Sequence, residues 1–193
     1  MVRAPVIISY ANKEERAQIA AWLQSPEYYE DAFLLPIRPD PAWVNAGFLL
    51  IKNPNGQELV SVNFWTIKDS SGKILGFSID YPFDVHQHDI REIDLALPNI
   101  PKHSGRLPFE AMAWTAHAVF QKEEPKQVRA RIRSTQGRQF SRIFARIGAV
   151  QTSASRLSLQ DERYRDRTEY HVTPEMFYNS YWAKRYGLEQ NNQ

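Results

Sequence analysis

The stretch "REIDLALPNIPKHSGRLPFEAMAW" spans residues 91 to 114 and joins a strand pattern to a helix pattern through a polar loop. In its first part apolar and acidic side chains alternate, so Ile93 shares a face with the leucines, while Glu92 and Asp94 share the other. Proline suits the first position of a helix, and Pro108 stands where an apolar, alanine-rich run begins. The stretch therefore predicts a strand, a loop and a helix in direct succession.

The loop "PKHSGRL" places two cations and a glycine immediately before this helix. The N-terminus of a helix carries unpaired N–H groups and the positive end of the helix dipole, and both favour a bound phosphate. A glycine lets the backbone approach such a ligand closely. The same residue types also form plain turns, so the loop is either a phosphate cradle or an ordinary connection.

The other segments predict a protein of mixed helices and strands with mostly antiparallel pairing. Asn55-Gly56 and Ser71-Gly72 are hairpin-type dipeptides between strand-like runs. The expected strands are residues 5–10, 47–53, 58–69, 73–81, 91–97, 127–134, 149–159 and 167–172. The expected helices are residues 13–24, 25–33, 108–121, 137–147 and 174–186, with a loop or helix start at 39–43.

Length and composition set the broad class. A chain of 193 residues with 42% hydrophobic and 24% charged residues suits one globular domain, alone or with an appendage. The chain contains no cysteine, which excludes disulfides and thiolate zinc sites. It has no apolar run long enough for a signal peptide or a membrane span, so we expect a cytoplasmic protein that does not enter a membrane.

Charge is distributed unevenly along the chain. Residues 1–125 hold 11 Lys/Arg and 16 Asp/Glu, a balance of −5, and residues 126–193 hold 13 and 6, a balance of +7. Ten of the eleven cations between Lys126 and Arg167 are arginines. Arginine forks match the geometry of phosphate, so this half is either a solvated surface or the binding face for an anionic partner.

Three of these arginines form a regular pattern. Arg129, Arg131 and Arg133 alternate with apolar residues, so they should form a row on one face of the strand at 127–134. The guanidinium groups would repel one another unless anions or carboxylates lie between them. A bound phosphate, the phosphate of a coenzyme and a nucleic-acid backbone are the candidate anions, and internal carboxylates are the alternative.

In its order of elements the chain resembles the GNAT superfamily of N-acyltransferases over about residues 5–173. In that family the fourth strand leads into a loop that opens the third helix, and the backbone N–H groups of this loop hold the pyrophosphate of acetyl-CoA. The family loop reads Arg or Gln, two residues, Gly, one residue, then Gly or Ala. Here Lys102 and Gly105 occupy the first two positions, and Leu107 departs from the last.

The resemblance implies an α/β (α+β) GNAT-like fold, with a mixed, mostly antiparallel sheet flanked by helices and an extra C-terminal aromatic helix. It divides the chain into an acyltransferase domain at 1–173 and a C-terminal helix with its tail at 174–193. It also implies acetyl-CoA as the donor. The implied coenzyme-binding residues are the backbone of Leu95, Ala96 and Leu97 and the loop residues Lys102, His103, Ser104, Gly105, Arg106 and Leu107.

The same resemblance suggests catalytic residues. In the histone-acetylating branch a Glu before an Ile on the fourth strand is the general base, and Glu92-Ile93 matches that dipeptide. Asp94 is a second candidate, and exposure to solvent would explain both acids without a function. Phe144 falls where a tyrosine often serves as general acid, so Ser141, Tyr170 or water would protonate the leaving thiolate.

The implied reaction is direct attack of an amine on acetyl-CoA in a ternary complex. The competing interpretation is a catalytically degenerate binding module of the same fold, whose arginine-rich face binds nucleic acid or an acidic partner. The acceptor amine is not fixed by these motifs. In the family it depends on variable segments, which here correspond to residues 24–46 and 69–90.

Two further patterns have ordinary explanations. His86 and His88 lie in a polar segment with nearby acids, a setting in which histidines are usually solvated, so we expect no metal site. The aromatic residues of the C-terminal helix should cover the sheet, and a homodimer contact is the alternative. They are Phe177, Tyr178, Tyr181, Trp182 and Tyr186.

Overall fold

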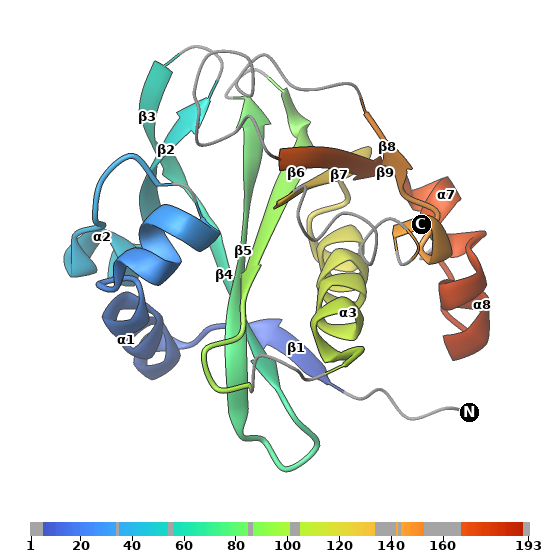
Figure 1. Cartoon of the computed structure of the whole chain (residues 1–193), viewed down its shortest axis with the longest axis horizontal. Coiled ribbons are helices and arrows are strands. Elements are labelled where there is room, and N and C mark those ends of the chain that lie inside the picture. The colour runs from blue at the N-terminus through green and yellow to red at the C-terminus, as the bar shows by residue number, and fades with distance from the viewer. Residues whose placement is uncertain are drawn as a thin grey trace.

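The structure is a computed structural model, and it describes residues 6–33, 35–53, 56–84, 87–100, 105–133, 142, 144–152 and 167–190. A seven-stranded sheet with the order β1-β4-β5-β6-β7-β9-β8 forms the centre, and β2 and β3 form a separate two-stranded sheet (Figure 1). Of the neighbouring pairs, β6 and β7 are parallel and the others are antiparallel. The expected mixed, mostly antiparallel sheet flanked by helices is confirmed.

The strands and helices have the following bounds. The strands are β1 (Ile7–Tyr10), β2 (Phe48–Asn53), β3 (Gly56–Ser61), β4 (Asn63–Lys68), β5 (Ile74–Asp84), β6 (Gln87–Ala96), β7 (Gln127–Arg133), β8 (Val150–Gln151) and β9 (Arg167–Val172). The helical segments are α1 (Lys13–Trp22), a π-helical turn η1 (Glu27–Ala32), α2 (Pro41–Ala46), α3 (Leu107–Lys122), α7 (Pro174–Tyr178) and α8 (Tyr181–Tyr186).

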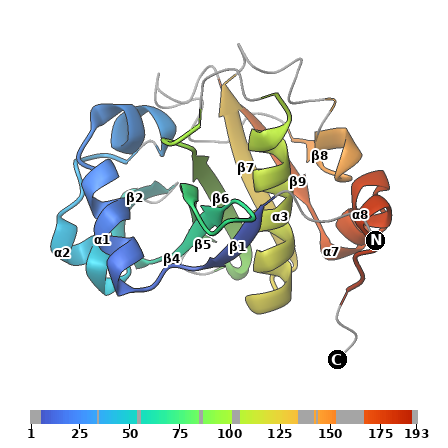
Figure 2. The same cartoon turned by 90° about the horizontal axis from the view of Figure 1, so that it is seen from below.

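Helices cover the sheet on both faces. The helices α1 and α2 and the β2–β3 hairpin lie on one face, and α3, α7 and α8 lie on the other (Figures 1 and 2). The first layer buries residues such as Ile19, Leu49 and Phe77, and the second buries Val119 and Phe177. A sheet covered on both faces buries both sets of alternating side chains, and this decides the environment of the site described below.

The strands β6 and β7 diverge part-way along their length. Their parallel register joins Ile90 to Gln127 and Glu92 to Arg129, and within the described residues of the two strands it goes no further. Beyond that point β6 pairs with β5 as far as Ala96, while β7 pairs with β9. Glu92 is therefore the last residue of β6 that pairs with β7, and it lies where the sheet begins to open.

Two predicted elements are confirmed, and local caps explain the ends of two helices. Asn12 caps α1, since its side chain accepts a hydrogen bond from the N–H of Glu15, whose carboxylate accepts one from the N–H of Asn12, both at 2.9 Å. The predicted helix at 108–121 is α3, and the arginine-bearing strand at 127–134 is β7. Gly187 ends the C-terminal helical region in the left-handed conformation that glycine adopts readily.

The single strand expected at 58–69 is wrong. It is two strands, β3 and β4, which belong to different sheets and flank Val62. The N–H of Val62 donates to the carbonyl oxygen of Gly47 at 2.8 Å, so this residue pairs outside the central sheet. Alternation alone could not reveal the break, because apolar residues continue through it.

The single C-terminal helix expected at 174–186 is also two helices, α7 and α8. Ser180 has an extended backbone, and its side chain accepts a hydrogen bond from the N–H of Ala183 at 3.1 Å, so it caps a new helix. Phe177 and Trp182 are buried within the chain's own core, as expected of residues that cover the sheet. The division into domains at residue 173 stays a prediction.

Other expectations need a changed boundary or lie partly outside the described residues. The strands expected at 73–81 and 91–97 are longer, since β5 reaches Asp84 and β6 begins at Gln87. Of the helix expected at 137–147, residues 142 and 144–146 are described and helical. Of the strand expected at 149–159 the structure describes residues 149–152, of which β8 is the strand part. In the described part of the chain no helix has both the length and the apolarity to cross a membrane.

Candidate active site

Glu92 and Asp94 lie on the face of β6 that is turned toward α1 and the β2–β3 hairpin, opposite to Ile93. Their exposed fractions are 2% and 9%. The interpretation of these acids as solvated surface residues is therefore wrong. Because β6 is an inner strand with layers packed on both of its faces, the polar half of its alternating pattern is buried as well.

Arg131 of β7 is the ion-pair partner of Glu92. The Arg131 guanidinium also donates to the hydroxyl oxygen of Tyr81 at 3.4 Å. Burial raises the pKa of Glu92 to about 7; the charge of Arg131 opposes this shift, and the charges of Asp94 and Glu169 add to it. A carboxyl group with such a pKa can take up and release a proton near neutral pH.

Asp94 binds a neighbour from the adjacent strand. The Tyr81 hydroxyl donates to Asp94 Oδ2 at 2.9 Å, and the Ser78 hydroxyl donates to the Asp94 carbonyl oxygen at 2.5 Å. Burial, followed by the charge of Asp94, raises the pKa of Tyr81 well above its ordinary value, so this phenol stays protonated. The arrangement links Glu92, Arg131, Tyr81 and Asp94 by contacts across three strands.

The segment expected to bind the coenzyme comes directly after Asp94 in the chain. Leu95 and Ala96 are in the part of β6 beyond its pairing with β7, and Leu97 follows the strand. Lys102, His103 and Ser104 lie outside the described residues.

The described part of the loop ends at the start of a long helix. Gly105 has a φ of +63°, a conformation that favours glycine, and apart from its chain neighbours no atom of the described residues lies within 4 Å of where a Cβ would be. Arg106 is the N-cap residue of α3, where its side chain makes no capping hydrogen bond, and Leu107 is the first residue of that helix.

The predicted arginine row is present on β7, but internal carboxylates neutralise its described members. Arg129 pairs with Glu169 of β9 at 3.3 Å, and Arg131 pairs with Glu92. The Arg129 guanidinium also lies over the ring of Phe83, 4.1 Å from its centre. These pairs give no support to a nucleic-acid surface made by the two arginines; the side chain of Arg133 lies outside the described residues.

The candidates for the general acid are only partly described. Phe144 is buried and stacks on the ring of Tyr170, with the ring centres 4.5 Å apart. Burial raises the pKa of Tyr170, so its hydroxyl is protonated at neutral pH. Ser141 lies outside the described residues.

Sequence reasoning missed Glu169 and Tyr81. A signal for Glu169 was available, because a row of arginines needs counter-charges and "RTEYHV" alternates on a strand of its own. Sequence reasoning also missed a second buried carboxylate, Asp80, which Arg91 and the indole N–H of Trp65 bind on the opposite face of the sheet. Burial raises the pKa of Asp80 to about 6.

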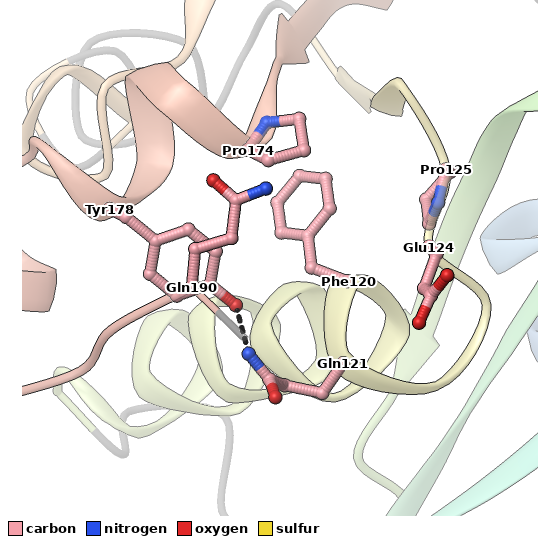
Figure 3. A pocket seen from close by; sticks show the side chains of 7 residues that line it. All are labelled: Phe120, Gln121, Glu124, Pro125, Pro174, Tyr178 and Gln190. Carbon is pink, nitrogen blue, oxygen red and sulfur yellow. Dashed lines mark hydrogen bonds between the residues drawn. The ribbon is translucent and has the colours of Figure 1, made fainter. Parts of the chain in front are cut away.

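Among the described side chains no group of metal-ligating residues is found, and the side chains of His86 and His88 are not among them. Figure 3 shows a pocket of about 250 Å³ at the C-terminal end of α3. Phe120, Pro125 and Tyr178 contribute to its walls, and none of the expected site residues lines it. An α3 of 16 residues separates this pocket from Gly105 by roughly 24 Å, so the two are distinct.

Comparison with known proteins identifies the fold. Neither a protein-family model nor a curated protein sequence matches the chain. Solved structures do match it, among them aminoglycoside acetyltransferase AAC(6')-Ib in complex with coenzyme A and kanamycin, at 14% identity and a TM-score of 0.58, covering 89% of this chain and 96% of that one. The chain has the GNAT fold.

Two other GNAT structures extend the comparison. Spermidine N-acetyltransferase from Vibrio cholerae, in complex with coenzyme A and spermine, matches at 8% identity and a TM-score of 0.64, covering 92% of this chain and 100% of that one. The putative acetyltransferase yncA from Salmonella typhimurium, with acetyl-CoA, matches at 15% identity and a TM-score of 0.59, covering 87% and 93%. In chain order β6 is the fourth strand of the central sheet, because β2 and β3 form the separate sheet. This is the position that the resemblance in element order implied.

Proposed function

We propose that the protein is an acyl-CoA-dependent N-acetyltransferase that transfers an acetyl group from acetyl-CoA to an amine. The observation that carries the proposal is Glu92, a buried carboxyl group with a pKa of about 7 at the point where β6 and β7 diverge. The strand β6 ends at Ala96, and the next described element of the chain is α3, which Gly105 and Arg106 precede. The proposed proton acceptor and the proposed phosphate-binding helix end therefore belong to successive elements of the chain, β6 and α3, and the coenzyme complexes of the GNAT neighbours support the choice of donor.

The donor would bind along these two elements. Backbone N–H groups near Gly105 and Leu107, at the positive end of the α3 dipole, would hold the pyrophosphate. The backbone of Leu95 to Leu97 would orient the pantetheine and polarise the thioester carbonyl. The positive φ of Gly105 and the open space beside it fit close approach of a phosphate.

The chemical step is direct transfer. The acceptor nitrogen attacks the thioester carbonyl, a C–N bond forms and the C–S bond breaks. Coenzyme A leaves as a thiolate and takes up, directly or through water, the second proton that the nitrogen loses as the amide forms. An alkyl ammonium with a pKa of about 10.4 must first lose a proton, and Glu92 or a water chain that begins there would accept it. Arg131 would hold the carboxylate in place, and Asp94 with Tyr81 would fix the neighbouring strand.

The test combines coenzyme binding with transfer. Calorimetry with acetyl-CoA and coenzyme A should show binding, and a panel of amines should yield N-acetyl products by mass spectrometry. Failure of acetyl-CoA and longer acyl-CoAs to bind at millimolar concentration would exclude the donor assignment. Binding without transfer to any amine, peptide or RNA would instead support the non-catalytic module, for which Phe144 in the position of the usual tyrosine is the favouring observation.

A further inference from the structure

One carboxylate next to the proposed reaction site has an oxygen atom that accepts no hydrogen bond from the described residues. Glu169 of β9 has an exposed fraction of 6%. Its Oε1 binds Arg129 at 3.3 Å and accepts from the Thr152 hydroxyl at 3.2 Å, while its Oε2 is buried and has no hydrogen-bond partner. Leaving a buried carboxylate oxygen unsatisfied is costly, so such an atom in a folded protein calls for a donor from a ligand or from water.

Glu169 lies on the same face of the sheet as Glu92. In the strand register Glu92 lies opposite Arg129, and Arg131 lies opposite Glu169. The ion pairs are diagonal instead, since Arg131 binds Glu92 and Arg129 binds Glu169. The two carboxylates thus lie on either side of β7 and within electrostatic range, since the charge of Glu169 contributes to the raised pKa of Glu92. Two strand spacings separate β6 from β9, on the order of 10 Å.

The unsatisfied oxygen belongs to a carboxylate, and this decides the kind of donor that suits it. Hydrogen bonds from a positively charged donor to a carboxylate are stronger than those between neutral groups. An ammonium group has three N–H donors and a full positive charge, so it suits Glu169 Oε2 well.

We propose that Glu169 binds a second, protonated amino group of the acceptor, so that the preferred acceptor is a diamine or polyamine whose reacting nitrogen lies at Glu92. The inference rests on the proposed function for the identity of the reacting end. Glu169 is then a specificity residue: it fixes the far end of the acceptor and the length of the chain between its nitrogens. It takes no part in the proton transfer.

The test compares Glu169→Gln with the wild type on matched acceptors. The substrates are the unbranched α,ω-diamines with three to eight carbons and the monoamines of equal length. The variant should raise KM for the best diamine about 10- to 100-fold, the effect of losing a charged hydrogen bond. The charge of Glu169 helps to raise the pKa of Glu92, so the assay is run at about pH 8.5, where Glu92 is ionised in both proteins. Under that condition Glu169→Gln should change KM for the matching monoamine less than about twofold, and kcat with either acceptor should stay close to that of the wild type.

Other outcomes separate this inference from the proposed function. Equal losses on diamine and monoamine would make Glu169 a scaffold for Arg129 and overturn the inference while the acetyltransferase assignment stands. If no amine is acetylated, calorimetric titration of the diamines into the coenzyme A complex tests whether the diamine site exists. If the wild type binds a diamine and Glu169→Gln does not, the diamine site is supported even without catalysis. If the wild type binds no diamine and only water lies at Oε2, the inference is refuted.

A shorter carboxylate keeps the test valid if Glu169→Gln does not fold. Glu169→Asp retains the charge but withdraws it by one methylene group. The diamine length with the lowest KM, or the tightest calorimetric binding, should then increase by about one carbon. An unchanged length preference in a folded Glu169→Asp variant would contradict direct contact between this side chain and the acceptor.

Discussion

At the scale of single residues, burial gives Glu92 its chemistry. An isolated Glu in a polar setting is ionised at neutral pH, but this one is taken out of water between two packed layers and faces both a cation and two other acids. Its proton affinity therefore lies near the value that a general base needs at neutral pH. The base must be ionised to work, so the transfer rate should fall as the pH falls through about 7.

The first prediction concerns Glu92→Gln, which preserves size but removes the basic oxygen. At neutral pH the rate should fall on the order of 10²–10⁴-fold. Much of the rate should return at high pH, because the free amine then no longer needs a base, and acetyl-CoA affinity measured by calorimetry should stay unchanged. Glu14→Gln, at an exposed carboxylate of α1, is the control and should behave as the wild type. Full activity of Glu92→Gln at pH 7 would show that this side chain is not the base.

At the scale of elements, the start of α3 combines the two properties of a phosphate site. The helix is long enough for a substantial dipole, and a glycine with positive φ precedes it. Gly187, at the end of α8, has nearly the same φ, +65° against +63°, and similarly open space around its Cβ position. The two glycines differ in function on the proposed assignment, although a substitution strains the backbone equally at either.

The second prediction uses this matched pair. Gly105→Glu and Gly187→Glu should each destabilise the protein by about 1–2 kcal/mol, the cost of a left-handed conformation in an L-residue. Acetyl-CoA should raise the melting temperature of the wild type and of Gly187→Glu. It should leave that of Gly105→Glu unchanged, because the new carboxylate repels the phosphates. Equal acetyl-CoA shifts in the two variants would place the coenzyme elsewhere.

At the scale of the whole molecule, the C-terminal helices complete the core on the α3 side of the sheet. Trp182 and Tyr186 of α8 both donate to the Glu110 carboxylate in the first turn of α3, each at 3.0 Å. Gly148 meets α7 at close range, and a Cβ there would lie 2.3 Å from the carbonyl oxygen of Met176. The segment after β9 is therefore packed against the helix that carries the proposed coenzyme site.

The third prediction tests this packing. Gly148→Ala combines a positive φ of +79° with a backbone clash, whereas Gly72→Ala has a similar φ of +87° and no neighbour within 4 Å. Chemical denaturation should show that Gly148→Ala costs about 1–3 kcal/mol more than Gly72→Ala, which is the cost of overpacking. If both variants lose the same stability, α7 can shift away from Gly148 without cost.

Local rules read from the sequence determined most of the elements and their order. The alternation of "REIDLAL" and the hairpin dipeptides each depend on residues a few positions apart, and so one sequence suffices to read them. The succession of strand, loop and helix at residues 91–114 then indicated the GNAT fold. The break at Val62 and the new helix after Ser180 were not predicted. A tertiary contact at Val62 and a helix cap at Ser180 interrupt patterns that continue in the sequence.

Only the tertiary structure decided what the polar residues of the strands do. Alternation put Glu92 and Asp94 on one face and the arginines in a row, but the same pattern fits a solvated surface. Burial of that face, and the pairing of Arg131 with Glu92 and of Arg129 with Glu169, join residues 39 and 40 positions apart in the chain. Such pairs depend on which strands become neighbours and which layer covers them. The charge state of a buried group is set by those neighbours, so the site's chemistry appears only when the sheet is assembled.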